Sequence, residues 1–111
     1  MKRPVIPTLL YTRQLGAFVD EYAARGAERL LSRLAESHEA MLENLERFEA
    51  MAPARRRRIA GKTVTVREHL LDAGAREFLG LYWVPPGDTE PILLLNLRIG
   101  GQNRYRWPRR G

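Results

Sequence analysis

Basic and polar side chains recur in the second half of the chain at a spacing that suits anion binding. Arg67 and His69 are two residues apart in a segment where polar and apolar residues alternate, and Asn96 and Arg98 repeat that spacing near the end of a later apolar run. Because alternate side chains of a β-strand point to the same face, each pair is expected to share one face. Guanidinium groups on such a face would bind a phosphate group through their forked donors.

The same alternation sorts three closing segments into two faces. These segments are residues 63–70, 76–84 and 91–99, separated by a turn at residues 72–74 and by the loop PPGDTEP. The face expected to pack on the core contains Val64, Val66, Leu70, Leu79, Leu81, Trp83, Leu93, Leu95, Leu97 and Ile99, with Glu68 as a polar exception. The opposite face is expected to contain Arg67, His69, Arg76, Phe78, Gly80, Tyr82, Ile92, Leu94, Asn96 and Arg98. A solvated sheet face would also be polar, but cations and aromatics without any acid favour a binding surface.

The charge of the chain also favours a polyanionic partner. The net charge is +6 and the sequence pI is about 10.5. Residues 1–52 contain 7 basic and 8 acidic groups, whereas residues 53–111 contain 12 and 5, so the excess lies in the second half. A nucleic acid or an acidic protein would suit that half, and a solvated basic surface is the alternative.

Two basic stretches outside the alternating segments are further candidates for nucleic-acid binding. The stretch ARRRRIAGK is either a solvated linker or an anion-binding element. The tail RYRWPRRG alternates cations with aromatics and is either a contact to RNA or a frayed terminus. The candidate binding residues are Arg55, Arg56, Arg57, Arg58, Lys62, Arg104, Tyr105 and Arg106.

Two helices and a first strand are expected to position this sheet. Pro4 and Pro7 bracket an apolar pair, which predicts an edge strand within residues 4–11. A short amphipathic helix is expected from Thr12 to Gly26, and a longer apolar stripe over residues 27–48 predicts a second helix. The short link favours an antiparallel helix hairpin. His38 lies within the stripe, where a hydrogen-bonded core or interface position is the expected role. The predicted fold is α+β: an N-terminal strand, the hairpin, and a three-stranded antiparallel meander with the helices on one face.

Length and composition exclude several classes of protein. A chain of 111 residues fits one domain, and 44% hydrophobic with 29% charged residues is typical of a globular fold. The absence of cysteine excludes disulfides and thiolate chemistry, and two distant histidines favour neither a metal site nor another cofactor. No stretch is apolar enough for a membrane span or a secretory signal, so a cytoplasmic protein is expected.

The element order and two stretches resemble the RelE/ParE toxin superfamily of type II toxin-antitoxin systems. These stretches are VREHLLDAGAREFLGLYWV and PILLLNLRIGG, and the resemblance extends from the first strand to Tyr105. Ribonuclease members carry two positive groups one residue apart on a basic strand, and Arg67 and His69 stand at those places. The family's next arginine, at the start of the following strand, is replaced here by Leu79, and Arg76 is the nearest basic residue. After the last strand the family has a basic cluster, whereas this chain has a Gly-Gln-Asn segment before residues 104–106.

The resemblance implies a single RelE/ParE-like domain over residues 1–111 that acts as a metal-independent, ribosome-dependent mRNA endoribonuclease and inhibits translation. The 2′-hydroxyl would attack the adjacent phosphorus, with His69 as the proton-transfer group. Arg67, Arg76 and Arg98 would neutralise the phosphoryl charge, and Tyr82 or Tyr105 would stack on a base or pass a proton. A cognate antitoxin is implied, whose acidic and apolar segments would cover the basic sheet face and the helix hairpin.

Two other functions remain open at this point. A second branch of the superfamily inhibits DNA gyrase without cutting RNA, and the displaced basic residues favour that branch. A non-catalytic module of phage or plasmid origin that binds nucleic acid or protein is the alternative outside the superfamily.

Overall fold

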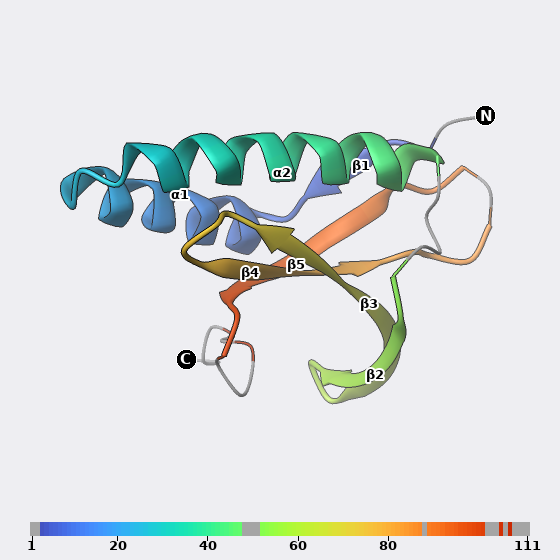
Figure 1. Ribbon diagram of the computed structural model, residues 1–111. Coiled ribbons are helices and arrows are strands. Elements are labelled where there is room, and N and C mark those ends of the chain that lie inside the picture. The colour runs from blue at the N-terminus through green and yellow to red at the C-terminus, as the bar shows by residue number, and fades with distance from the viewer. Residues whose placement is uncertain (1–2, 48–51, 88, 102–104, 106, 108–111) are drawn as a thin grey trace.

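The computed structural model describes residues 3–47, 52–87, 89–101, 105 and 107 and has the predicted α+β architecture. Two helices lie along one face of a five-stranded sheet whose strand order is β1-β5-β4-β3-β2 (Figure 1). The elements follow one another as β1 (Val5–Pro7), α1 (Leu9–Ala24), α2 (Glu28–Arg47), β2 (Ala54–Ile59), β3 (Lys62–Asp72), β4 (Glu77–Trp83) and β5 (Ile92–Ile99). We call the sheet face under the helices the helix face and the opposite one the open face.

The first strand is shorter than predicted because a helix cap follows it. β1 ends at Pro7 and pairs in parallel with β5. Thr8 then adopts an extended conformation, and its side-chain oxygen accepts a hydrogen bond from the backbone N–H of Tyr11 at 3.3 Å. This bond satisfies one of the N–H groups that a helix start leaves unpaired. Leu9, Leu10 and Tyr11 therefore belong to α1 and not to the expected strand.

The helix hairpin agrees with the prediction from periodicity. α1 and α2 run antiparallel, side by side (Figure 1), and the chain turns between them at Gly26, whose φ is +70°. The side chains of Leu30, Leu34, Met41 and Leu45 are buried along one stripe of α2. His38 lies in this stripe, half-buried, and its Nε2 is 2.8 Å from the hydroxyl oxygen of Tyr11. The expected hydrogen-bonded interior role of His38 is confirmed.

The arginine run forms a strand that the sequence did not predict. β2 pairs antiparallel with β3, so the meander has four strands and not three. The two strands join through Ala60 and Gly61, with φ of +51° and +79°. Two consecutive positive φ angles make a type I′ turn, which suits the twist of a hairpin.

Side chains on both faces of the sheet are buried, and the predicted assignment of faces is inverted for β3, β4 and the first part of β5, but correct for Leu97, Arg98 and Ile99. On the helix face Leu71, Phe78, Tyr82, Ile92, Leu94 and Leu97 pack with the helices. On the open face Val66, Leu81 and Tyr105 form a second cluster, against which Ile59, Val64, Trp83 and Leu95 pack. Leu81 pairs with Asn96 but its neighbour Tyr82 pairs with Leu94, so Leu95 is an extra residue in β5. Such a bulge shifts the alternation of side chains by one residue.

Among the described helices, neither is both long enough and apolar enough to cross a membrane.

Candidate catalytic and nucleic-acid site

Strand pairing separates the residues that were predicted to share a binding face. Arg67 pairs with Tyr82 and His69 pairs with Gly80, and side chains directly opposite each other in a sheet lie on the same face. Tyr82 packs in the core beneath the helices, so Arg67 and His69 lie on the helix face. Arg98 pairs with Leu79 on the open face. The predicted cluster of Arg67, His69, Tyr82 and Arg98 on one wall is therefore wrong.

The cause of the error is that β4 is apolar on both faces. Phe78 and Tyr82 are fully buried under the helices, while Leu81 is fully buried on the open face. Hydrophobic alternation therefore could not indicate which set faces the helices. The prediction placed Leu79, Leu81 and Trp83 on the same face as Leu97 and Ile99, and it is inverted for β4 and for β3, which pairs with β4.

The three residues on the helix face, Arg67, His69 and Tyr82, make contacts that stabilise the fold. Arg67 donates a hydrogen bond from Nη1 to the backbone oxygen of Ala52 at 2.6 Å, which holds the start of β2 against β3. Burial lowers the pKa of His69, and a hydrogen bond with the backbone of Leu70 offsets part of that effect. Tyr82 is fully buried. These positions suit the stability of the sheet better than contact with a substrate.

Arg76 and Asn96 also lie away from the expected wall. Arg76 is exposed at the turn before β4, where its backbone oxygen accepts a hydrogen bond from the N–H of Ala73 at 3.0 Å. Asn96 is fully buried, and its Oδ1 accepts a hydrogen bond from Nε2 of Gln14 at 2.8 Å. Oε1 of Gln14 in turn accepts from the N–H of Leu97 at 2.8 Å, so α1 covers the part of β5 that extends beyond its pairing with β1.

A different polar cluster occupies the open face, centred on the carboxylate of Glu68. Arg55 Nε lies 3.2 Å and Arg57 Nη2 lies 3.3 Å from Oε1, while Arg98 Nη2 lies 3.5 Å from Oε2. The hydroxyl of Tyr105 donates a hydrogen bond to Oε2 at 2.8 Å. These five residues, Arg55, Arg57, Glu68, Arg98 and Tyr105, are called the Glu68 cluster below. With three guanidinium groups and one carboxylate, its formal charge is +2.

Burial within the Glu68 cluster is graded from the carboxylate outward. The side chains of Glu68 and Arg98 are 12% and 14% exposed, whereas those of Arg55 and Arg57 are 56% and 41% exposed. The partly buried pair is therefore held in place by its neighbours, and the two outer arginines remain accessible to an anion in solution. Coulombic attraction between the inner groups is strengthened by their removal from water.

Tyr105 closes the cluster from the chain beyond β5. The guanidinium carbon of Arg98 lies 4.9 Å from the centre of the Tyr105 ring, within the range of a cation–π contact. Burial is the main cause that raises the pKa of the Tyr105 hydroxyl, and the hydrogen bond and negative charge of Glu68 raise it further, while Arg98 acts in the opposite direction. Tyr105 therefore keeps its proton at neutral pH and donates it to the carboxylate.

The remaining predicted binding residues fall into two groups. Arg56 and Arg58 pair with Thr65 and Thr63, so they point away from the Glu68 cluster, and they and Lys62 at the hairpin end are exposed. Arg104 and Arg106 lie outside the described residues. Of the predicted site residues, the structure brings together Arg55, Arg57, Arg98 and Tyr105.

Glu68 is the central residue that the sequence did not predict as functional. The alternation of side chains predicts Glu68 on the core face, as a polar exception. The signal was present, because Glu68 is the one acid between residues 53 and 71, a stretch that contains six basic residues. An isolated acid in a basic strand is expected to pair with cations from neighbouring strands.

Comparison with known proteins finds no matching family model, no matching curated protein and no matching solved structure.

Proposed function

We propose that this chain is the toxin of a type II toxin-antitoxin system, acting in the cytoplasm as a metal-independent endoribonuclease on mRNA at the ribosome. The observation that supports this function is the Glu68 cluster, in which one carboxylate lies within 2.8 to 3.5 Å of a tyrosine hydroxyl and of guanidinium nitrogens. A proton acceptor, a proton donor and phosphate-binding cations are the groups that cleavage by a 2′-hydroxyl requires.

The proposed reaction conserves protons within the cluster. A carboxylate oxygen of Glu68 takes the proton of the RNA 2′-hydroxyl, and the 2′-oxygen forms a bond to phosphorus. The bond from phosphorus to the 5′-oxygen breaks, and that oxygen takes the proton of Tyr105. The proton on Glu68 then returns to Tyr105 along their 2.8 Å contact. The products are a 2′,3′-cyclic phosphate and a 5′-hydroxyl.

The arginines of the cluster would bind and stabilise the phosphoryl group. Arg98 lies inside the cluster, in contact with Glu68 and with the Tyr105 ring. These contacts would orient the N–H donors of its guanidinium group before RNA binds. Arg55 and Arg57 are more exposed and would contact phosphates on either side of the cut bond. Preorganised donors of this kind stabilise charge that develops in the transition state.

An antitoxin partner is part of this proposal. A groove of about 490 Å³ lies between α1 and α2, and its lining includes Leu15, Val19, Leu31, Leu34, His38 and Leu42. An amphipathic segment of the antitoxin would place its apolar side chains in this groove. Acidic side chains of the antitoxin would bind the outer arginines of the Glu68 cluster.

Gyrase inhibition is the second candidate, and the observation that favours it is the position of Arg67 and His69 away from Arg98. One pair of assays separates these functions. Purified protein is added to translating ribosomes and mRNA ends are mapped, and in parallel it is added to gyrase and supercoiled DNA. Cuts in the ribosomal A site support the ribonuclease. Cleaved DNA without mRNA cuts supports gyrase inhibition, and the absence of both contradicts either toxin function and favours a non-catalytic binding module.

A further inference from the structure

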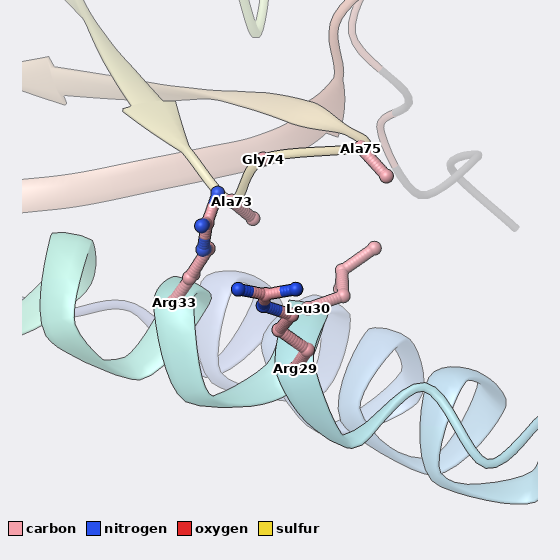
Figure 2. A pocket seen from close by; sticks show the side chains of 6 residues that line it. All are labelled: Arg29, Leu30, Arg33, Ala73, Gly74 and Ala75. Carbon is pink, nitrogen blue, oxygen red and sulfur yellow. The ribbon is translucent and has the colours of Figure 1, made fainter.

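A cationic cleft lies on the helix side of the molecule, between the start of α2 and the turn that joins β3 to β4 (Figure 2). Its volume is about 310 Å³, and its walls are formed by Arg29, Leu30, Arg33, Ala73, Gly74 and Ala75. Figure 2 shows that Arg33 reaches from α2 to the turn and that the guanidinium of Arg29 lies in the gap between helix and turn. The cleft shares no residue with the Glu68 cluster.

The two arginines are placed where positive charge is unfavourable without an anion. Arg29 and Arg33 are four residues apart on α2, and like charges at that spacing repel each other by roughly 0.2–0.5 kcal/mol. Arg29 lies in the first turn, at the positive end of the helix dipole, and Arg33 lies one turn further along α2. Within the part of the chain that the structure describes, neither forms an ion pair. Arg25, by contrast, pairs with Glu21 at 2.9 Å.

The wall opposite α2 is a fixed turn with a glycine at the point of closest approach. Gly74 has φ of +84°, and a Cβ at this residue would lie 2.6 Å from Nη1 of Arg33. Oδ1 of Asp72 accepts a hydrogen bond from the N–H of Gly74 at 2.8 Å, so this carboxylate oxygen binds the turn itself. Ser37 of α2 donates a hydrogen bond to the backbone oxygen of Asp72 at 2.6 Å, which ties the turn to the helix.

We propose that this cleft binds a phosphate group between the guanidinium groups of Arg29 and Arg33. Their forked donors match phosphate oxygens, and a bound anion removes the repulsion between the two side chains. The absence of a side chain at residue 74 leaves room for the guanidinium of Arg33 beside the turn, where it can reach an anion bound in the cleft. The site is separate from the Glu68 cluster, and it stands whether or not the open face cleaves RNA.

Titration of ¹⁵N-labelled protein with inorganic phosphate tests the site, with ionic strength held constant by sodium chloride. The expected result is saturable shifts of the Gly74 amide and the Arg29 and Arg33 Nε–H signals. The double variant Arg29→Ala/Arg33→Ala should bind about tenfold more weakly, as judged by the Gly74 amide. The matched control, Arg13→Ala/Arg47→Ala, removes two exposed helix arginines and should leave the affinity unchanged.

A second arm identifies the source of the phosphate. A short single-stranded oligoribonucleotide is titrated into the Glu68→Gln variant, in which the open face is expected not to cleave the RNA during the titration, and binding at the cleft is followed by the Gly74 amide alone. The same shifts with RNA assign the cleft to a phosphodiester, and shifts with inorganic phosphate alone assign it to a small phosphate ligand. Non-saturating shifts, or equal affinity in the Arg29→Ala/Arg33→Ala variant and the intact protein, would overturn the proposal.

Discussion

The hydroxyl of Tyr105 donates a hydrogen bond to Oε2 of Glu68 at 2.8 Å, which links the chain beyond β5 to the middle of β3. The same tyrosine lies over the guanidinium of Arg98 at the end of β5. Three distant parts of the sequence thus meet on the open face. Any chemistry on that face depends on Tyr105 as much as on the strands.

Replacement of Tyr105 by Phe tests the role of the hydroxyl group separately from that of the ring. The ring would remain over Arg98, while the charge-assisted hydrogen bond to Glu68 is lost, at a cost of about 1.5 kcal/mol in the free energy of unfolding. Loss of proton transfer should lower mRNA cleavage by about 100-fold. Cleavage is measured with translating ribosomes, and stability by chemical denaturation.

Tyr82→Phe is the matched control for that variant. Tyr82 was first predicted to be catalytic, but it is fully buried under the helices. Its replacement should leave the cleavage rate within a factor of about two, whatever it does to stability. A loss of cleavage equal to that of Tyr105→Phe would show that the tyrosine effect is indirect.

Glu68→Gln should change RNA binding and RNA cleavage in opposite directions. The variant removes the negative charge between Arg55, Arg57 and Arg98, so the affinity for a noncleavable oligonucleotide should be higher than that of the intact protein. This affinity should also decrease more steeply as the salt concentration increases. Cleavage should fall because an amide does not accept a proton. Filter binding across a salt series measures the RNA affinity and its dependence on salt, and cleavage is measured with translating ribosomes.

The control for Glu68→Gln is Glu77→Gln, which removes the same charge from an exposed position at the start of β4. A similar gain in RNA affinity in both variants would mean that net charge alone, and not the Glu68 cluster, determines binding.

Stability should fall as the pH is lowered below about 6.5, the ordinary pKa of histidine. Burial lowers the pKa of both His38 and His69 in the folded protein. The unfolded chain therefore binds more protons between the folded and ordinary pKa values, and the free energy of unfolding decreases with decreasing pH in that window. Denaturation at pH 7.5 and 5.5, chosen about one unit either side of that value, measures the slope.

Replacing the two histidines by Gln should flatten this dependence. A slope that is unchanged in the His38→Gln/His69→Gln variant would assign the pH effect to other groups.

The β2–β3 turn should tolerate a stabilising change. Ala60 has φ of +51°, a conformation that costs an L-residue roughly 1–2 kcal/mol, and Asn adopts it more readily. Ala60→Asn should therefore raise the melting temperature by a few degrees, whereas Gly61→Ala should lower it. Thermal unfolding followed by circular dichroism checks both. A lower melting temperature for Ala60→Asn would contradict the assignment of a type I′ turn.

The helices could be predicted from the sequence because a long period-3.6 stripe such as that of α2 has no alternative arrangement. The α+β class and the last three strands followed from period-two alternation and turn residues. β2 could not be predicted because four consecutive arginines show no alternation of polar and apolar residues. Its strand conformation is evident only from its pairing with β3.

The faces of the sheet could not be predicted for a different reason. β4 buries apolar side chains on both faces, and the extra residue Leu95 shifts the alternation within β5. The contact between Tyr105 and Glu68 depends on the path of the chain after β5, which no local pattern encodes. The Glu68 cluster therefore depends on strand pairing and on a chain path that local sequence patterns do not specify.

The most direct test of the central claim compares Glu68→Gln with His69→Gln on translating ribosomes, because adjacent residues of β3 point to opposite faces of the sheet. Mapped mRNA ends should show cuts for the intact protein and for His69→Gln, and few or none for Glu68→Gln. If Glu68→Gln cuts as well as the intact protein while His69→Gln does not, the active surface is the helix face and the role assigned to the Glu68 cluster is wrong.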